Sequence, residues 1–138
     1  MRFPERYKIQ GDFTLHSGQN SDVFYDVNAM LTYDYYLRQI LDKVPRGDHY
    51  VGIATGGAII ARVISLERES KFSMIKDGEL KGDFPKGKWI LIDDVVNTGA
   101  SLEEAVKIVG KNPEEMFVVL DRRTRNSKPE VFSVFDPY

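Results

Sequence analysis

Two adjacent carboxylates stand directly before a short segment rich in glycine and hydroxyl side chains. Asp93 and Asp94 follow the apolar run Trp89–Ile92, and residues 97–101 read Asn-Thr-Gly-Ala-Ser. Glycine permits backbone angles at which consecutive N–H groups converge on one anion, and the hydroxyl groups add donors. We expect a phosphate group to bind here. The carboxylates would then hold the hydroxyl groups of an attached sugar, directly or through a divalent cation.

The elements around this segment support that interpretation. The run Trp89–Ile92 is typical of a buried strand, and the pattern from Ser101 to Val109 predicts a helix. Open α/β sheets bind ligands at the carboxyl ends of their strands, and a helix start directs its positive end to the same point. The alternative is a structural turn, in which the acidic pair caps the backbone and Ser101 caps the helix.

Composition limits the classes of protein that remain possible. The chain has 138 residues, 42% hydrophobic and 29% charged, with a formal net charge of −2. A single globular domain is expected, and without a basic excess we expect no nucleic-acid binding. The absence of cysteine excludes disulfides, thiolate metal sites and cysteine nucleophiles. We recognise neither a secretory signal nor an apolar run of membrane-spanning length, so a cytoplasmic protein without membrane contact is expected.

Short β-branched runs alternate with helical patterns along the chain. Strands are predicted at residues 13–15, 23–27, 50–53, 71–75, 89–92, 116–120 and 131–135, and helices at 33–44, 58–66 and 101–109. This alternation predicts an α/β fold with a mostly parallel central sheet flanked by helices. Residues 77–88 are rich in glycine, proline and charge, so we expect a mobile surface loop there that could close over a ligand.

The run Ile90–Ser101 resembles the signature of the type I phosphoribosyltransferases, in which apolar residues and an acidic pair precede Asn/Thr-Thr-Gly-x-Ser/Thr. Within that family, the stretch Phe13–Asp26 (FTLHSGQNSDVFYD) resembles the orotate phosphoribosyltransferases. The segments Val51–Ala61 (VGIATGGAIIA) and Leu120–Arg122 (LDR) agree with them in order and separation. The resemblance therefore covers nearly the whole chain in four segments.

The resemblance implies one phosphoribosyltransferase domain over residues 1–138. A small β-containing hood on the base side (residues 1–30) would precede a Rossmann-like core (residues 31–138). The implied reaction moves phosphoribosyl from phosphoribosyl pyrophosphate to orotate and releases pyrophosphate, a step of pyrimidine nucleotide synthesis. Mg²⁺ would be the cofactor, held largely by oxygens of the substrate, with Asp93 and Asp94 as the candidate protein ligands. A homodimer is expected.

The resemblance also implies roles for the phosphate-binding residues. Asp93 and Asp94 would bind the ribose hydroxyls. The 5-phosphate would lie in a segment that we call the phosphate loop, formed by Val95, Val96, Asn97, Thr98, Gly99, Ala100 and Ser101. The leaving group would lie in the pyrophosphate loop, formed by Ala54, Thr55, Gly56 and Gly57, with a cis peptide bond between the first two.

Four residues would face the base by the same resemblance: His16, Phe24, Tyr25 and Arg122. Arg122 would pair with the orotate carboxylate, a task suited to a planar fork of donors. Two simpler alternatives stay open. The adjacent aromatic residues alternate along a strand, so one of them is expected in the core. Arg122 follows a buried strand and is equally able to pair with Asp121 or a surface carboxylate.

The sequence departs from the family pattern in its cations. Orotate enzymes usually carry a loop with Arg-Lys-x-x-Lys-x-His-Gly, whereas this chain offers Lys76 and Lys81 and lacks the loop arginine and histidine. His16 and Gly56 stand where many relatives have lysine. Lys76 and Lys81 are the candidates to stabilise the leaving pyrophosphate, and fewer cations should slow its departure.

The sequence leaves three other functions open. One is a regulatory domain that binds phosphoribosyl pyrophosphate or a nucleotide without turnover. Another is a phosphoribosyltransferase for a different base. The third is a structural or interaction domain that binds no ligand.

Overall fold

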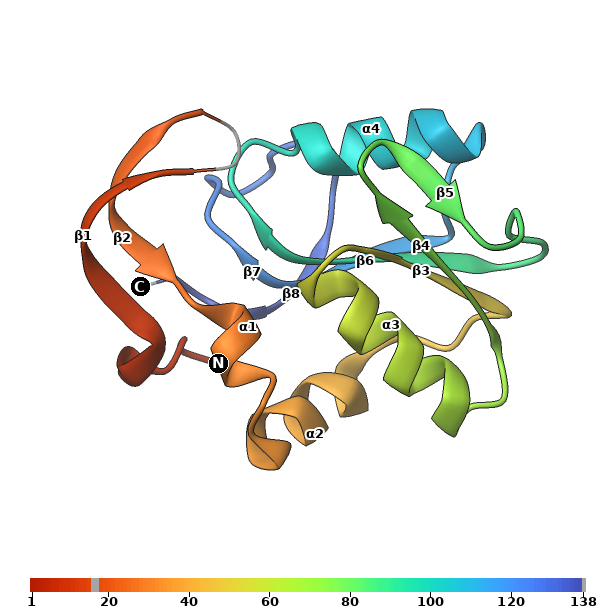
Figure 1. Ribbon diagram of the computed structural model, residues 1–138, viewed down its shortest axis with the longest axis horizontal. Coiled ribbons are helices and arrows are strands. Elements are labelled where there is room, and N and C mark those ends of the chain that lie inside the picture. Colours follow the sequence, from red (N-terminus) through yellow and green to blue (C-terminus); the bar gives the residue numbers. More distant parts are fainter. Residues whose placement is uncertain (16–17, 138) are drawn as a thin grey trace.

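The computed structural model describes residues 1–15 and 18–137, which contain a six-stranded sheet and a separate two-stranded sheet (Figure 1). The large sheet consists of β3 (His49–Ile53), β4 (Lys71–Lys76), β5 (Glu79–Lys81), β6 (Trp89–Val96), β7 (Glu115–Asp121) and β8 (Phe132–Phe135). Their order is β5-β4-β3-β6-β7-β8, and only the edge pair β4–β5 is antiparallel. The prediction of a mostly parallel sheet is confirmed.

Helices cover both faces of this sheet (Figure 1). On one face lie α1 (Val27–Met30), α2 (Asp34–Lys43) and α3 (Gly56–Glu67), and on the other lies α4 (Ala100–Val109). Successive residues of β6 place their side chains on opposite faces of the sheet, because side chains alternate along a strand. Ile90 and Ile92 pack with α2 and α3, whereas Leu91 packs with α4. Burial on both faces explains why this strand reads as an unbroken apolar run.

The two-stranded sheet lies to one side of the large sheet (Figure 1), within residues 1–30, the segment that we call the hood. It pairs β1 (Lys8–Thr14) with β2 (Asn20–Tyr25) after a short 3-10 helix, η1 (Glu5–Tyr7). Phe3 joins the hood to the core, since its ring lies 5.1 Å from that of Tyr25 and 5.8 Å from that of Phe135.

The predicted strands of the hood were misplaced at their ends. β1 begins at Lys8, whereas the prediction began at residue 13. The prediction missed the first half of the strand because this half is largely exposed and carries no apolar alternation. The second strand was predicted to reach Val27, but that residue opens α1. The Asp26 carboxylate accepts a hydrogen bond from Ala29 N at 3.1 Å, so it caps the helix and ends the strand.

Part of the predicted loop at residues 77–88 is instead a hairpin. Glu79 pairs with Lys76, which leaves Asp77 and Gly78 as a two-residue turn with φ of 52° and 75°. An Asp-Gly pair with positive φ at both residues is the preferred composition of such turns. Leu80 of β5 packs against the core on the α4 side, which ties this segment to the domain.

Glycines allow α3 to lie unusually close to the sheet. A Cβ added at Gly52 would stand 2.3 Å from the carbonyl oxygen of Gly57, and one added at Gly57 would stand 2.3 Å from the carbonyl oxygen of Ile92. The first turn of α3 is therefore in backbone contact with β3 and β6. This contact determines where the segment before α3 meets the end of β6.

We predict that Gly52→Ala destabilises the protein by about 3 kcal/mol or more, because a methyl group cannot share space with a backbone carbonyl. Gly110→Ala is the matched control, since Gly110 has open space around it and only its φ of 87° is unfavourable to alanine. That variant should lose about 1–2 kcal/mol. Urea denaturation followed by circular dichroism measures both. Equal losses would contradict the packing argument.

Candidate functional site

The acidic pair stands near the carboxyl end of β6, where the predicted strand continues to Val96. Asp93 is 6% exposed and accepts a hydrogen bond from Asp94 N at 2.8 Å. Asp94 is half-buried and accepts one from Val95 N at 2.7 Å. Burial raises the pKa of Asp93 well above its ordinary value, and the neighbouring charge of Asp94 raises it further. Negative charge on these two carboxylates is therefore unfavourable, because one is buried and the two are adjacent.

The pyrophosphate loop lies directly against this pair. A Cβ added at Gly56 would stand 2.8 Å from Asp94 Oδ2 and 2.7 Å from Asn28 Oδ1. The peptide bond between Ala54 and Thr55 is cis, as the resemblance implied. Three elements, α1, β6 and the start of α3, thus meet at one point.

Asn28 is a site residue that the sequence analysis missed. It lies in the first turn of α1, and its side-chain oxygen points to the space between Gly56 and Asp94. The only signal in the sequence was Asp26, a capping residue type that would have indicated a helix start two residues earlier. Nothing in the sequence pairs residue 28 with residues 56 and 94.

The phosphate loop divides into two parts in the structure. Val95 and Val96 belong to β6 and pair with β7, so the loop itself runs from Asn97 to the start of α4. Gly99 has a φ of 93°, a left-handed conformation that favours glycine, and Ala100 begins the helix. Ala100 N donates to Thr98 Oγ1 at 3.2 Å. Helical N–H groups that have no carbonyl partner within the helix therefore lie beside the acidic pair, as an anion site requires.

Arg122 connects the phosphate loop to the hood. Its Nη1 donates to Asn97 Oδ1 at 3.2 Å and its Nη2 donates to Ser21 Oγ at 3.1 Å. The guanidinium carbon also lies 4.7 Å from the ring centroid of Tyr25. The alternative pairing with Asp121 is not observed, since Asp121 binds the next arginine, Arg123, at 3.0 Å.

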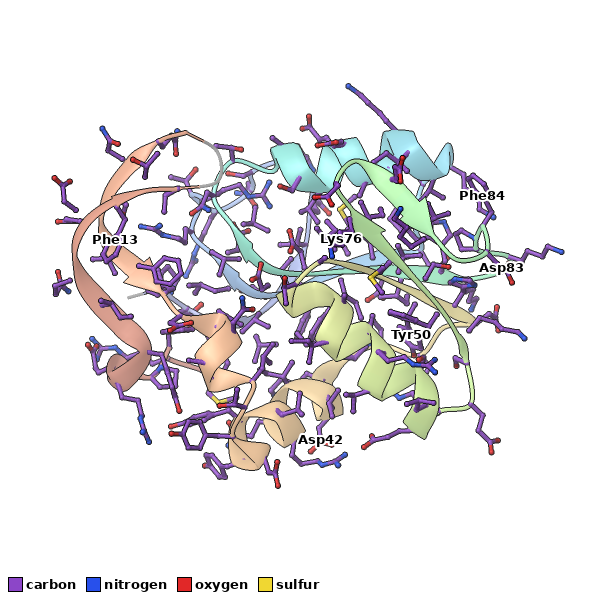
Figure 2. All side chains as sticks on the ribbon, in the orientation of Figure 1. Phe13, Asp42, Tyr50, Lys76, Asp83 and Phe84 are labelled. Carbon is purple, nitrogen blue, oxygen red and sulfur yellow. The ribbon has the colours of Figure 1, made fainter. Side chains whose placement is uncertain are left out.

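The remaining predicted base-facing residues differ in their burial and in their neighbours. Tyr25 is half-buried, packs against the core and lies under Arg122. Phe24 is 41% exposed, and its ring lies 5.5 Å from that of Phe13 on the hood (Figure 2). The expectation that one aromatic residue of the pair belongs to the core fits Tyr25. His16 lies outside the described residues.

Of the two candidate lysines, Lys76 lines the same groove as part of the pyrophosphate loop, whereas Lys81 forms an ion pair within the hairpin. Lys76 ends β4 and lines a groove together with Ala54 and Thr55 of the pyrophosphate loop (Figure 2). Lys81 pairs with Met74, further back along β4, and its Nζ lies 2.6 Å from Glu79 Oε2. Its charge is therefore already compensated by a neighbouring carboxylate.

Comparison with known proteins identifies relatives over most of the chain. No family model matches. The orotate phosphoribosyltransferase of Methanothermobacter thermautotrophicus is 32% identical over 129 residues, which cover 82% of this chain and 72% of that protein. The orotate phosphoribosyltransferase of Aeropyrum pernix is 28% identical over 120 residues, 75% of this chain and 64% of its own length. The chain thus spans about two thirds of these relatives.

Solved structures agree with the sequence relatives. The crystal structure of orotate phosphoribosyltransferase from Aeropyrum pernix superposes with a TM-score of 0.78 at 26% identity, covering 95% of this chain and 89% of that chain. An adenine phosphoribosyltransferase from Leishmania donovani has the same fold, with a TM-score of 0.65 at 18% identity, covering 86% and 72%. The sheet, its helices and the glycine turn before α4 therefore define a type I phosphoribosyltransferase fold.

Within that class the sequence similarity is more specific. The chain is 32% identical to the Methanothermobacter thermautotrophicus protein and covers 72% of its length. The chain therefore belongs to the orotate phosphoribosyltransferase family. In the part of the chain that the structure describes, no helix is long and apolar enough to cross a membrane.

The buried Asp93 predicts a dependence of stability on pH. Its pKa in the folded protein lies above the ordinary 3.8, so the folded state holds this proton more tightly than the unfolded chain does. The resulting contribution to stability is complete below that ordinary value and is lost as pH rises through the folded-state pKa. Above that ordinary value, burial of the Asp93 carboxyl therefore opposes folding.

We accordingly predict that Asp93→Asn raises the melting temperature at pH 7 by on the order of a few degrees. The difference from the wild type should narrow as pH falls, because a protonated Asp93 is uncharged like asparagine. Differential scanning calorimetry across this range checks it. Asp42→Asn on exposed α2 is the control and should shift little. A destabilised Asp93→Asn at pH 7 would contradict the prediction.

Proposed function

We propose that this protein transfers phosphoribosyl from phosphoribosyl pyrophosphate to orotate and releases pyrophosphate. The observation that carries the proposal is a convergence of segments far apart in the sequence. Gly56 of the pyrophosphate loop lies against Asp94, and Arg122 donates to Asn97 of the phosphate loop, three residues after Asp94. Membership of the orotate phosphoribosyltransferase family supports orotate as the base.

The proposed reaction needs no nucleophilic side chain. A nitrogen of orotate forms a bond to C1 of the ribose while the bond from C1 to the pyrophosphate oxygen breaks. Positive charge develops on the ribose and negative charge on the leaving group, so alignment and electrostatic stabilisation are the tasks of the protein. The described chain supplies them with the two loops and Lys76.

Each subsite has a proposed occupant. The 5-phosphate binds the N–H groups at the start of α4 and the Thr98 and Ser101 hydroxyls. The ribose hydroxyls donate to Asp93 and Asp94, whose unfavourable charge this relieves. Orotate lies between the hood (residues 1–30) and the core (residues 31–138) of a single domain. Its carboxylate pairs with Arg122, which stands at that boundary.

Mg²⁺ fits the donor set as a metal carried by the substrate. No group of three or more metal-binding side chains occurs among the described residues. The oxygens available are those of Asp93, Asp94 and Asn28, and Mg²⁺ commonly uses one or two carboxylates together with substrate phosphates and water. When bound, the ion would neutralise charge on the pyrophosphate.

One observation favours the second candidate function, ligand binding without turnover. Lys81 is paired with Glu79 within the hairpin, which leaves Lys76 as the predicted lysine beside the pyrophosphate loop. The deciding experiment incubates the protein with phosphoribosyl pyrophosphate, Mg²⁺ and a panel of bases, and measures nucleotide formation. We expect orotidine monophosphate from orotate. Tight binding of phosphoribosyl pyrophosphate with no nucleotide from any base would establish the second function instead.

Arg122→Lys should lower kcat/KM for orotate by about 10- to 100-fold, because lysine keeps the charge but loses the paired donors. Arg125→Lys, at an exposed position of the same segment, is the control. Steady-state rates with orotate measure both variants. An Arg122→Lys enzyme with unchanged kcat/KM for orotate would remove the proposed contact to the orotate carboxylate.

We further propose that two copies of the chain associate through α3 and β4. A groove of about 590 Å³ between these elements is lined mainly by apolar side chains, among them Ile59, Phe72 and Met74. Ile59 is 38% exposed, and Arg62 lies over the Phe72 ring at 5.4 Å. The groove also includes Ala54 and Thr55, so a partner there would lie beside the pyrophosphate loop.

Ile59→Glu should convert the expected dimer into a monomer, because a charge in an apolar interface loses its solvation. Sedimentation velocity at several protein concentrations measures the state. Tyr35→Glu on α2, where the native side chain is 68% exposed, is the control and should remain dimeric. A wild-type protein that stays monomeric at all concentrations would refute the dimer.

A further inference from the structure

Arg123 is a buried charge directly behind the phosphate loop. Its side chain is 6% exposed. Nε and Nη2 donate to the two carboxylate oxygens of Asp121, at 3.0 and 3.1 Å, and Nη2 also donates to the Pro129 carbonyl at 2.8 Å. Nη1 is buried as well, yet it has no hydrogen-bond partner among the residues that the structure describes.

The unpartnered nitrogen faces the glycine turn. A Cβ added at Gly99 would stand 3.1 Å from Arg123 Nη1 and 3.2 Å from Pro129 Cδ. A side chain at Gly99 would crowd the guanidinium against the backbone of this turn. Arg122 holds Asn97 of the same loop. Two consecutive arginines thus contact the phosphate loop.

A purely structural role accounts for only part of this arrangement. The guanidinium stays charged at every relevant pH, and Asp121 compensates that charge through Nε and Nη2. Nη2 also fixes the connection between β7 and β8 through Pro129. These contacts leave Nη1 unexplained, because a buried donor without an acceptor is unfavourable. The nearest place where the fold expects negative charge is the anion site that begins at Gly99.

We propose that Arg123 is a positioning residue for the 5-phosphate subsite. It supports Gly99 in the left-handed conformation that opens α4, and it turns the unpartnered Nη1 donor toward the loop that binds the phosphate. The ligand class is a sugar carrying a terminal phosphate monoester. This inference rests on the proposed function, since it assigns the phosphate loop to the 5-phosphate rather than to pyrophosphate.

The test compares two ligands that should occupy different loops. Ribose 5-phosphate reports on the phosphate loop, and inorganic pyrophosphate in the presence of Mg²⁺ reports on the pyrophosphate loop. Arg123→Met removes the charge and the donors, whereas Arg123→Lys keeps the charge alone. Arg125→Met is the matched control, an exposed arginine two residues along the same connection. Isothermal titration calorimetry gives both dissociation constants for each protein.

We expect Arg123→Met to weaken ribose 5-phosphate binding by about tenfold or more, with pyrophosphate affinity changed by less than about twofold. Arg123→Lys should recover part of the loss, and Arg125→Met should match the wild type. In turnover, KM for phosphoribosyl pyrophosphate should rise more than kcat falls. Should Arg123→Met fail to fold in a thermal scan, the selective loss in Arg123→Lys decides the matter.

Other outcomes count against the inference in distinguishable ways. Equal weakening of both ligands would make Arg123 a structural residue only. Unchanged ribose 5-phosphate binding in both Arg123 variants would remove it from the subsite, while the proposed function would stand. A wild-type protein that binds neither ligand would overturn the proposed function and this inference together.

Discussion

The close packing of α3 against β3 and β6 is the constraint on which the site depends. Gly52 and Gly57 bring the two backbones into contact, and this contact sets the pyrophosphate loop beside the acidic pair. The same geometry explains why a residue without a side chain stands at Gly56. A Cβ there would stand 2.7 Å from Asn28 Oδ1 and 2.8 Å from Asp94 Cβ, so a larger residue requires these side chains to shift.

Burial within the sheet explains the electrostatic character of the site. Placing Asp93 inside β6 removes it from water, and Asp94 adds a second charge beside it. The fold thus maintains a local arrangement that does not favour its own stability, a common feature of ligand sites. Ribose hydroxyls or a cation would supply the missing donors and charge. The burial of Asp93 follows from the fold, and it also favours the binding of a ligand.

Most elements, and the segments that form the site, could be predicted from the sequence, because each carries a local signal. β6 is an apolar run, the turn at Gly99 has its glycine, and α2 has a helical period. The exposed half of β1 has no such alternation, and the Asp-Gly turn of the β4–β5 hairpin lay within a charged stretch that resembles a loop. Asn28 and Arg123 act through residues that are distant in the sequence, so no local pattern could identify them.

The adjacent arginines show most clearly what the chain alone does not determine. Either one could pair with Asp121 by sequence, and the structure gives that carboxylate to Arg123. Arg122 is thereby left to bridge Asn97 and Ser21, which joins the phosphate loop to the hood. A two-stranded sheet is marginal by itself, so this bridge and the Phe3 contacts help to hold the hood over the core. A base carboxylate on Arg122 would share its donors with both neighbours, and the base and phosphate subsites would then depend on one side chain.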